Sequence, residues 1–546
     1  MIKRNFAFVL LLIFFSSCGR DGKDMRLVSI GISSDIQSAS PVYSFGVSES
    51  ILFEHTNLGL VGHKWDSTKG GLTDYPLLAK DWKWNDSRDE VVFTLRSDIK
   101  WSDGKAFSPE DIVFTYSVYS NPVVQSSFFG MFDKFHTLEN GQIDIKNTFE
   151  IISPQKIKFK FLKNSNPSLL ETDLPIIAKH IFEGIPDSLI SVSDAIFKSC
   201  GTGPYKLKKW ERNQYILLEK RKGHFLVNDL SPSRIILKVI PEYFTRKNQL
   251  LTGEIDVLPE INTEDIYEFE NRKDLNISAM QGRYIDFICW NNINPEAFLK
   301  NSVKPNKYFG GKEIRKALTY AINRKMILDE FLLGRGSVAN EPVSPIFKDY
   351  YSKSNDFSYD PKKALAILKN AGWHDSDKNG ILDKNGQEFS FTLNFVTGKP
   401  LREYTANIVK SDLKKIGINV NLEPLERGIF LEKMYSRQMD AFISGWQVPI
   451  PLHIKPYWYS DLKKYQTNTS GFMNKEIDQL LDKTLQTNDP AELKHIYNKI
   501  QDLIRENQPV TFLFWIDNFS VYSSKIKNAE VNSLGSVQRC WEWEVR

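Results

Sequence analysis

Alternating hydrophobic and polar positions predict several β-strands along this chain of 546 residues. Over residues 155–162, three apolar side chains alternate with three lysines, so one face of a strand would lie in a core and the other in solvent. The same period of two predicts strands over 389–395 and 418–422. Residues 510–516 are apolar except for Thr511, which is typical of a strand buried on both faces.

Helix starts are marked by capping residues that precede apolar positions spaced three and four apart. Residues 108–111 read Ser-Pro-Glu-Asp, which supplies an N-cap hydroxyl, a first-turn proline and an acid at the third position. Asp-Pro pairs at 360–361 and 489–490 open two more helices, and another begins near Lys312. Strands and helices are mixed without an internal repeat, so we predict a mixed α/β protein of several domains.

The N-terminus has the charged, apolar and small-residue order of a secretory signal peptide. Lys3 and Arg4 precede an apolar run over residues 6–15. A membrane-spanning helix needs about 20 apolar residues, so this run is too short to remain as one. We therefore predict a cleaved signal peptide over residues 1–17 and an exported protein.

Cys18 follows two serines and precedes a glycine at the expected cleavage point. This order resembles the lipobox of bacterial lipoproteins, in which the cysteine is acylated, although Phe15 stands where leucine is usual. The resemblance implies lipidation of Cys18 and a polar tether over 18–26. An ordinary cleaved signal with an incidental cysteine is the alternative.

Composition describes a folded protein with more than one hydrophobic core. Hydrophobic residues make up 41% and charged residues 25% of a chain too long for a single core. The formal charge of +4 falls to +2 when Lys3 and Arg4 leave with the signal. Neither nucleic acid nor an anionic lipid surface is therefore predicted as a partner, and the interspersed charges should form a solvated surface.

The remaining cysteines and the acidic loops predict no metal or cofactor. Cys200, Cys289 and Cys540 form no CxxC pair, and we expect three free thiols, with a Cys200–Cys540 disulfide as the alternative. Residues 375–380 begin like a calcium-binding loop, but the twelfth position is Gly386 instead of glutamate. A polar hairpin is the better interpretation.

Four widely spaced segments, in a fixed order, carry a resemblance to a known family. They are the block 78–114, which contains Trp101-Ser102-Asp103-Gly104; residues 201–207, which begin Gly-Thr-Gly-Pro-Tyr; the helix 314–324; and 359–373. Together they are similar to the bacterial extracellular solute-binding proteins of the peptide and nickel family, family 5. Each block also has a plain structural interpretation: Gly104 supplies a turn, and Gly201 and Gly203 let the chain bend between domains.

The resemblance implies an α/β, two-lobed periplasmic-binding-protein-like fold with mixed sheets and an extra accessory domain. The two lobes would close on a ligand about a hinge near residues 286 and 507. The implied division is lobe I over 27–66, 201–285 and 508–546, an accessory domain over 67–200, and lobe II over 286–507.

The resemblance also points to ligand-binding residues. In peptide-binding members a Gly-Trp pair ends a strand of the second lobe, and an acid follows that pairs with the ligand's α-amine. Here Trp446 matches and Gln447 follows, but the acid is missing, so recognition of a free peptide N-terminus is in doubt. Trp290 and Asn291 occupy another segment that is expected to face the cleft; packing in the core is the alternative for both tryptophans.

The resulting prediction is a monomeric, non-enzymatic receptor for an oligopeptide-like solute, lipid-anchored on the periplasmic side of the cell envelope. Its partners would be an ABC permease and its ATPase subunits, because the chain itself has no phosphate-binding GxxxxGK[ST] loop. A ligand sensor or surface lipoprotein of the same fold is the first alternative. A secreted hydrolase is the second, although the sequence contains neither HExxH nor a nucleophile elbow.

Overall fold

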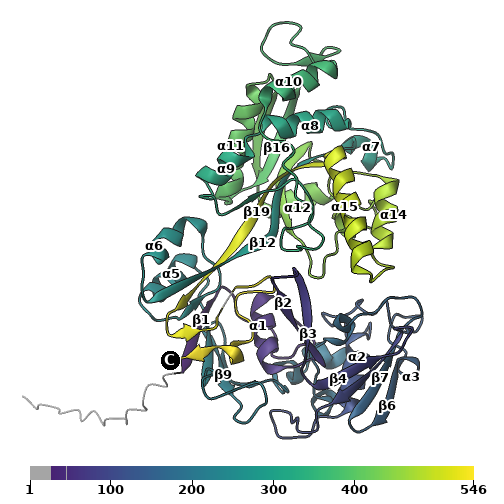
Figure 1. The fold of residues 1–546 in the computed structure, drawn as a ribbon, viewed down its shortest axis with the longest axis vertical. Helices are drawn as coiled ribbons and strands as arrows, with labels where there is room; N and C mark the ends of the chain where they lie inside the picture. The colour runs from purple at the N-terminus through teal and green to yellow at the C-terminus, as the bar shows by residue number, and fades with distance from the viewer. Residues whose placement is uncertain (1–25, 45, 530) are drawn as a thin grey trace, which may run out of the picture.

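The computed structural model describes residues 26–44, 46–529 and 531–546, so the predicted signal peptide and Cys18 lie outside the described residues. Figure 1 shows two bodies joined by the long strands β12 (Leu275–Trp290) and β19 (Val510–Ser523). Elements between residues 27 and 274 and after 523 form the lower body, and those between 291 and 509 form the upper body. This is the two-lobed mixed α/β fold that the resemblance implied.

One mixed sheet runs through both bodies. Its order is β17-β16-β18-β12-β19-β11-β1-β10-β9-β8, and β13 pairs with β19 beside this path. The β1 strand is parallel to β10 and β11, and β16 is parallel to β17 and β18, while the other pairs are antiparallel. The remaining bounds are β1 (Leu27–Ile32), β8 (Tyr205–Glu211), β9 (Tyr215–Lys220), β10 (Arg234–Val239), β11 (Val257–Leu258), β13 (Gly336–Val338), β16 (Ser390–Val396), β17 (Asn419–Leu425) and β18 (Ala441–Gln447).

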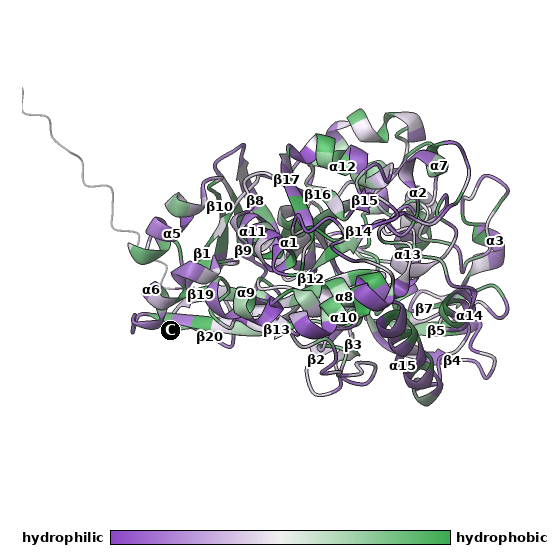
Figure 2. Ribbon diagram, turned by 90° about the horizontal axis from the view of Figure 1, so that it is seen from above, coloured by the Kyte–Doolittle hydropathy of each residue, from purple (hydrophilic) through white to green (hydrophobic). Residues whose placement is uncertain are grey.

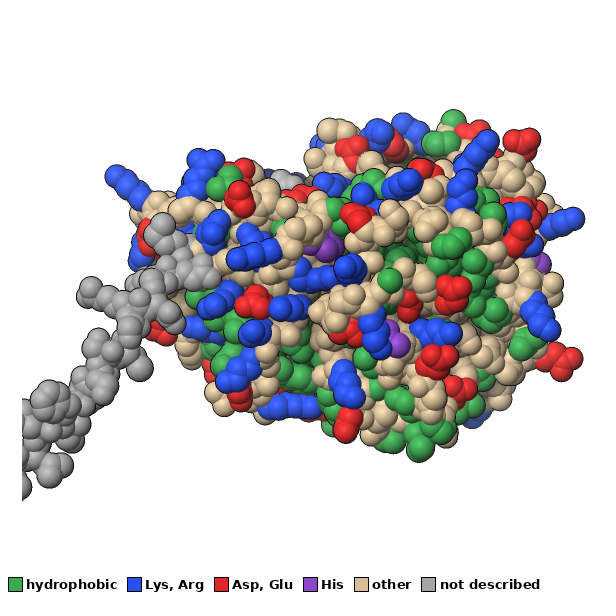
Figure 3. All heavy atoms as spheres, turned by 90° about the horizontal axis from the view of Figure 1, so that it is seen from below, with side chains coloured by type: hydrophobic (Ala, Val, Ile, Leu, Met, Phe, Trp, Pro, Cys, Tyr) green, Lys and Arg blue, Asp and Glu red, His purple; other side chains and the backbone are tan. Residues whose placement is uncertain are grey.

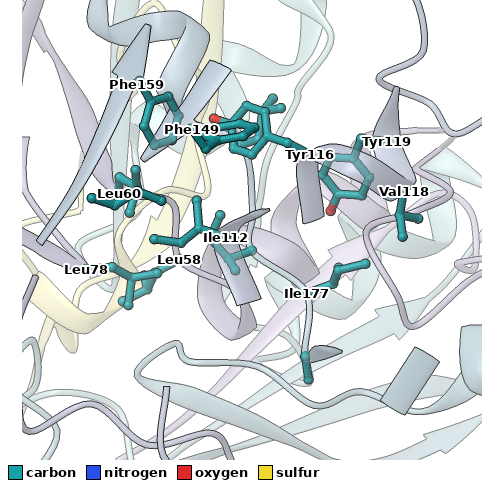
Figure 4. Close-up of a cluster of buried hydrophobic side chains, with 14 of the residues drawn as sticks. Leu58, Leu60, Leu78, Ile112, Tyr116, Val118, Tyr119, Phe149, Phe159 and Ile177 are labelled. Atoms are coloured by element: carbon teal, nitrogen blue, oxygen red, sulfur yellow. The ribbon is translucent and has the colours of Figure 1, made fainter. Parts of the chain in front are cut away.

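A second, antiparallel sheet forms its own core in the lower body, in the order β4-β5-β7-β6. Its strands are β4 (Ala79–Trp84), β5 (Glu90–Leu95), β6 (Phe149–Ser153) and β7 (Lys156–Lys160). The predicted alternation is confirmed, because Ile157 and Phe159 are fully buried while the three lysines that alternate with them are at least partly exposed. Figure 4 shows Phe159 and Phe149 packed with Tyr116 above the leucines of this core.

Small hairpins and helices complete the two bodies. The hairpins pair β2 (Val61–Asp66) with β3 (Gly71–Pro76), β14 (Asp383–Lys384) with β15 (Gln387–Glu388), and β20 (Ile526–Lys527) with β21 (Glu544–Val545). Helices of the lower body are α1 (Val47–Thr56), α2 (Pro109–Tyr119), α3 (Ile145–Thr148), α4 (Lys179–Phe182), α5 (Tyr243–Leu251) and α6 (Ile266–Glu270). Those of the upper body are α7 (Pro295–Leu299), α8 (Lys312–Ala321), α9 (Arg324–Glu330), α10 (Pro361–Asn370), α11 (Pro400–Lys414), α12 (Arg427–Tyr435), α13 (Lys455–Trp458), α14 (Lys475–Lys483) and α15 (Pro490–Asn507).

The predicted helix starts are confirmed by their caps. Ser108 and Asp111 form a capping box at the start of α2, and the Asp360 carboxylate accepts a hydrogen bond from the Lys363 amide at the start of α10. The Asp489 carboxylate caps α15 in the same way. In Figure 2, α15 carries hydrophilic residues along its outer face, as expected of a helix that buries one stripe.

The two bodies also touch away from β12 and β19. At the tip of the β2–β3 hairpin, Gly70 lies directly against the backbone of residues 346–348. A side chain there would clash, since a Cβ atom would sit 2.2 Å from the Ile346 carbonyl oxygen. Trp65 on the same hairpin packs edge-on against Phe347 with ring centres 6.0 Å apart.

Gly201 and Gly203 also meet a packing constraint that the sequence did not indicate. Neither has a positive φ; instead, both lie against the backbone at the end of α1. A Cβ atom at Gly201 would sit 1.8 Å from the Thr56 carbonyl oxygen, and one at Gly203 would sit 2.4 Å from that of His55. The glycines are needed for close backbone approach, a constraint that arises only in the folded molecule.

The cysteines and the charged surface agree with the sequence. Cys200, Cys289 and Cys540 are free thiols, so the alternative disulfide is wrong. Figure 3 shows basic and acidic side chains interspersed over one face of the molecule. Among the helices of the described residues, none is both long and apolar enough to span a bilayer.

Candidate ligand-binding site

An aromatic group surrounds Trp446 near the end of β18, the strand between β16 and β12. The partly buried Trp446 ring stacks on Tyr457, with ring centres 4.7 Å apart and planes 13° apart. It packs against Phe287 of β12 at 4.1 Å and meets Trp458 edge-on at 5.7 Å. Contacts on several sides hold the indole in one orientation and form an aromatic wall of the kind that lines binding sites for organic ligands.

The Trp446 side chain keeps an unused hydrogen-bond donor. Its Nε1 atom is buried and has no hydrogen-bond partner among the described residues. Leaving a buried donor unsatisfied costs about 1–3 kcal/mol, and the indole Nε1 atoms of Trp458 and Trp515 are likewise buried without a partner. An acceptor on a bound molecule would satisfy the Trp446 N–H and would recover that free energy.

A buried ion pair lies on the opposite face of the sheet from the Trp446 ring, because Asp286 of β12 is in register with Gly445, and its partner Arg402 comes from α11. The Arg402 guanidinium donates to an Asp286 carboxylate oxygen at 2.9 Å and to the Tyr284 hydroxyl at 2.8 Å. Asp286 faces Gly445 in the β12–β18 register, and a Cβ atom at Gly445 would sit 2.3 Å from the Asp286 carboxylate. The glycine before Trp446 therefore makes room for a buried acid.

The electrostatics of Asp286 are set by burial and by Arg402. Burial raises the pKa of the Asp286 carboxyl, and the adjacent guanidinium opposes that rise. The Arg402 cation already balances the Asp286 carboxylate, so the pair is neutral as a whole.

Arg283 links the two bodies next to the aromatic group around Trp446. Its guanidinium donates from Nη1 to the Val448 carbonyl oxygen of the upper body at 2.6 Å and from Nε to that of Ser533 in the lower body at 3.2 Å. Gln447 lies immediately before Val448; its side chain is exposed, and its carbonyl oxygen accepts a hydrogen bond from the Tyr457 hydroxyl at 3.4 Å. Trp446 and Gln447 are thus brought together at the crossing between the bodies.

Trp290 and Asn291 are not brought to this group. The Trp290 indole is fully buried and donates to the Thr511 hydroxyl at 2.9 Å. The buried Asn291 amide donates to the carbonyl oxygens of Arg437 and Met439 at 2.9 and 3.1 Å. Both side chains use their polar atoms in packing of the upper body, so the geometry gives no support to the cleft-facing position predicted for them.

Sequence reasoning missed Asp286 and Arg402. A signal for Asp286 was present, because an acid within the otherwise apolar run 284–290 needs a buried partner. Nothing in the sequence indicates that the partner is Arg402, which lies 116 residues away. The loop that begins at Asp375 uses a carboxylate oxygen of that residue to accept the Gly380 amide at 3.1 Å, as expected of a polar hairpin.

Comparisons with known proteins connect this geometry to a family. Residues 74–468 match the model of the bacterial extracellular solute-binding proteins, family 5 Middle. The oligopeptide-binding protein AppA of Bacillus subtilis is 30% identical over 459 residues, which cover 82% of this chain and 80% of AppA.

Two solved structures extend the comparison to nearly the whole chain. The structure of AppA from Bacillus subtilis in complex with a nonapeptide has a TM-score of 0.71 at 26% identity and covers 95% of this chain and 99% of AppA. The structure of NikZ from Campylobacter jejuni in complex with Ni(L-His) has a TM-score of 0.72 at 25% identity, with the same two coverages.

Proposed function

The chain belongs to the bacterial extracellular solute-binding proteins of family 5, and on that premise we propose that it captures an oligopeptide-like ligand between its two bodies. Proteins of this family bind solutes for ABC importers and are not enzymes. The ligand would be delivered to a membrane permease, with ATP hydrolysed on other subunits. The similarity to an oligopeptide-binding protein supports peptide as the ligand class.

The observation that carries this proposal is the unsatisfied indole N–H of Trp446 on the aromatic wall. Peptide main chains offer carbonyl acceptors at every residue, and aromatic rings offer apolar contact area without selecting one side chain. A partly buried tryptophan with a spare donor at the crossing of the bodies suits such a ligand. Gln447, exposed beside it, adds an amide that can both donate and accept.

The mode of peptide recognition follows from the lack of an available acid next to Trp446. A buried ammonium group needs an anionic partner, but residues 444–453 contain no acid, and Asp286 on the neighbouring strand points to the other face of the sheet and is paired with Arg402. We therefore propose that the ligand is held by its main chain and that its free α-amine contributes little. Longer or N-terminally blocked peptides would bind as well as free ones.

Titration calorimetry with the purified mature chain tests the ligand class. The expected result is heat of binding with a pool of nonapeptides, of similar affinity for free and N-acetylated peptides, and none with nickel salts. The Trp446→Ala variant should bind at least tenfold more weakly, whereas Trp84→Ala, a partly buried tryptophan of the second sheet, should bind as the wild type does. Binding of nickel in place of peptide would contradict the proposed ligand class.

We propose that the hinge of closure lies near residues 286 and 507, where the chain passes between the bodies.

The proposed location in the cell rests on Cys18, which would carry the lipid and tether the protein to a membrane. The Cys18→Ala variant should move from the membrane fraction to the soluble fraction of cells. Membrane retention equal to that of the wild type would contradict the anchor.

A further inference from the structure

Three metal-ligating side chains from separate segments meet in the lower body, away from Trp446. Asp103 lies in a turn before α2, His180 lies on α4, and Cys200 lies just before Gly201. One ligand atom of each residue lies within 4.8 Å of the other two. The His180 Nε2 and an Asp103 carboxylate oxygen are 2.7 Å apart.

The backbone holds each of these side chains independently of the others. The other Asp103 carboxylate oxygen accepts the Lys105 amide at 3.1 Å, so the only side-chain contact that a bound ion would replace at Asp103 is the one with His180. The Lys179 amide, next to His180, donates to Asp111 at 3.0 Å. The Ser102 amide donates to the Gly201 carbonyl oxygen at 2.9 Å, which fixes the turn that carries Asp103 against the chain at Cys200.

We propose that Asp103, His180 and Cys200 bind a divalent transition-metal ion of the zinc class. Thiolate, imidazole and carboxylate are the donors that Zn²⁺ takes in proteins, with bonds of about 2.0–2.3 Å. Tetrahedral geometry with such bonds separates the donor atoms by about 3.4 Å. The present separations of 2.7 Å and up to 4.8 Å bracket that value, so side-chain shifts of less than about 1 Å would accommodate the ion.

The site has the features of an open metal centre. Three protein ligands leave the fourth position to water. The Asp103 and His180 side chains are 37% and 21% exposed, so an ion can reach them from solvent. Coordination requires loss of the Cys200 thiol proton, which passes to solvent as the metal–sulfur bond forms.

The bound ion would join the second sheet's region to the rest of the lower body. Asp103 and His180 belong to the region around the β4–β7 sheet, whereas Cys200 begins the segment that leads into β8. The ion would therefore stabilise the docking of these parts without contacting the peptide ligand. No pattern along the chain indicates this site, because the ligands are spaced 77 and 20 residues apart and match no metal motif.

Cobalt substitution tests the proposal on the full mature chain. With one equivalent of Co²⁺, the wild type should develop a sulfur-to-cobalt charge-transfer band, and competition with Zn²⁺ should remove it. Cys200→Ser should abolish the band, and His180→Gln should weaken Zn²⁺ binding at least tenfold. His495→Gln, which changes an exposed histidine on α15, should leave both unchanged.

Two outcomes would overturn the proposal. One is the absence of the charge-transfer band in the wild type; the other is Zn²⁺ binding of equal affinity in wild type and Cys200→Ser, which would mark adventitious surface binding. If either variant fails to fold, the wild-type band and its competition by Zn²⁺ still decide the question. Peptide binding is measured separately, so failure here leaves the proposed function untouched.

Discussion

Trp101 and Trp446 make an instructive comparison, because both lie in segments that resemble the same family. Trp101 is 1% exposed, and its indole N–H donates to Asp111, the residue that also completes the capping box of α2. Trp446 is partly exposed, and its indole N–H has no partner among the described residues. The Trp101 N–H is hydrogen-bonded within the protein core, whereas the Trp446 N–H, at the crossing of the bodies, has no hydrogen-bond acceptor among the described residues.

Removal of Trp101 should have the largest effect on stability. Trp101→Ala removes a large buried ring and one of the hydrogen bonds to Asp111, so the free energy of unfolding should fall by about 3–5 kcal/mol. Urea denaturation followed by circular dichroism measures this loss. A loss below about 1 kcal/mol would contradict the scaffold role.

Breaking the Asp286–Arg402 ion pair should cost nearly as much. Arg402→Met leaves the Asp286 carboxylate buried without its cation, which should lower the free energy of unfolding by about 3 kcal/mol. Adding Asp286→Asn removes the uncompensated charge and should restore most of the loss. Equal instability of the single and double variants would show that the charge is not the cause.

Substitution of Trp446, unlike that of Trp101, should change ligand affinity more than stability. Trp446→Phe keeps most of the aromatic contact but removes the unsatisfied N–H, so stability should stay within about 1 kcal/mol of the wild type. Peptide affinity should nevertheless fall about fivefold, since one hydrogen bond to the ligand is lost. Calorimetry and thermal unfolding of the same sample separate the two effects, and unchanged affinity would remove Trp446 Nε1 from the site.

The smallest expected effect concerns His63, which fastens the β2–β3 hairpin to the lower body. Its ring lies 2.8 Å from Asp74 and 3.1 Å from Asp173. Burial alone would lower the pKa of His63, but the two carboxylates raise it to about 9. The pKa rises because an anionic group lies beside each ring nitrogen.

A raised histidine pKa stabilises the folded protein at low pH. The contribution is fully present below the ordinary value near 6.5 and is lost as pH rises through about 9. His63→Gln should therefore cost about 1 kcal/mol at pH 6, after allowance for solvent screening, and almost nothing at pH 10. Unfolding measured at both pH values checks this, and an equal cost at both would contradict it.

Local patterns predicted the elements well, but not their pairing. The alternation in β7 and the caps of α2, α10 and α15 depend on neighbouring residues and could be predicted from them. The order of the mixed sheet depends on partners far apart along the chain, such as β1 between β10 and β11, and no short pattern encodes it.

The site was predictable only in part for the same reason. Trp446 was proposed from its resemblance to the family's Gly-Trp segment and remains a prediction, while the Asp286–Arg402 pair forms only when the sheet assembles. The same resemblance pointed, less strongly, to Trp290. What separates them is that Thr511 satisfies the indole of Trp290.

The most direct test is a crystal structure of the mature chain bound to a nonapeptide from the binding pool. The account predicts that the peptide lies between the two bodies, with one of its acceptors within hydrogen-bond distance of Trp446 Nε1 and Asp286 still paired with Arg402. A bound peptide that leaves Trp446 Nε1 without a partner, or that lies outside the crossing of the bodies, would contradict it.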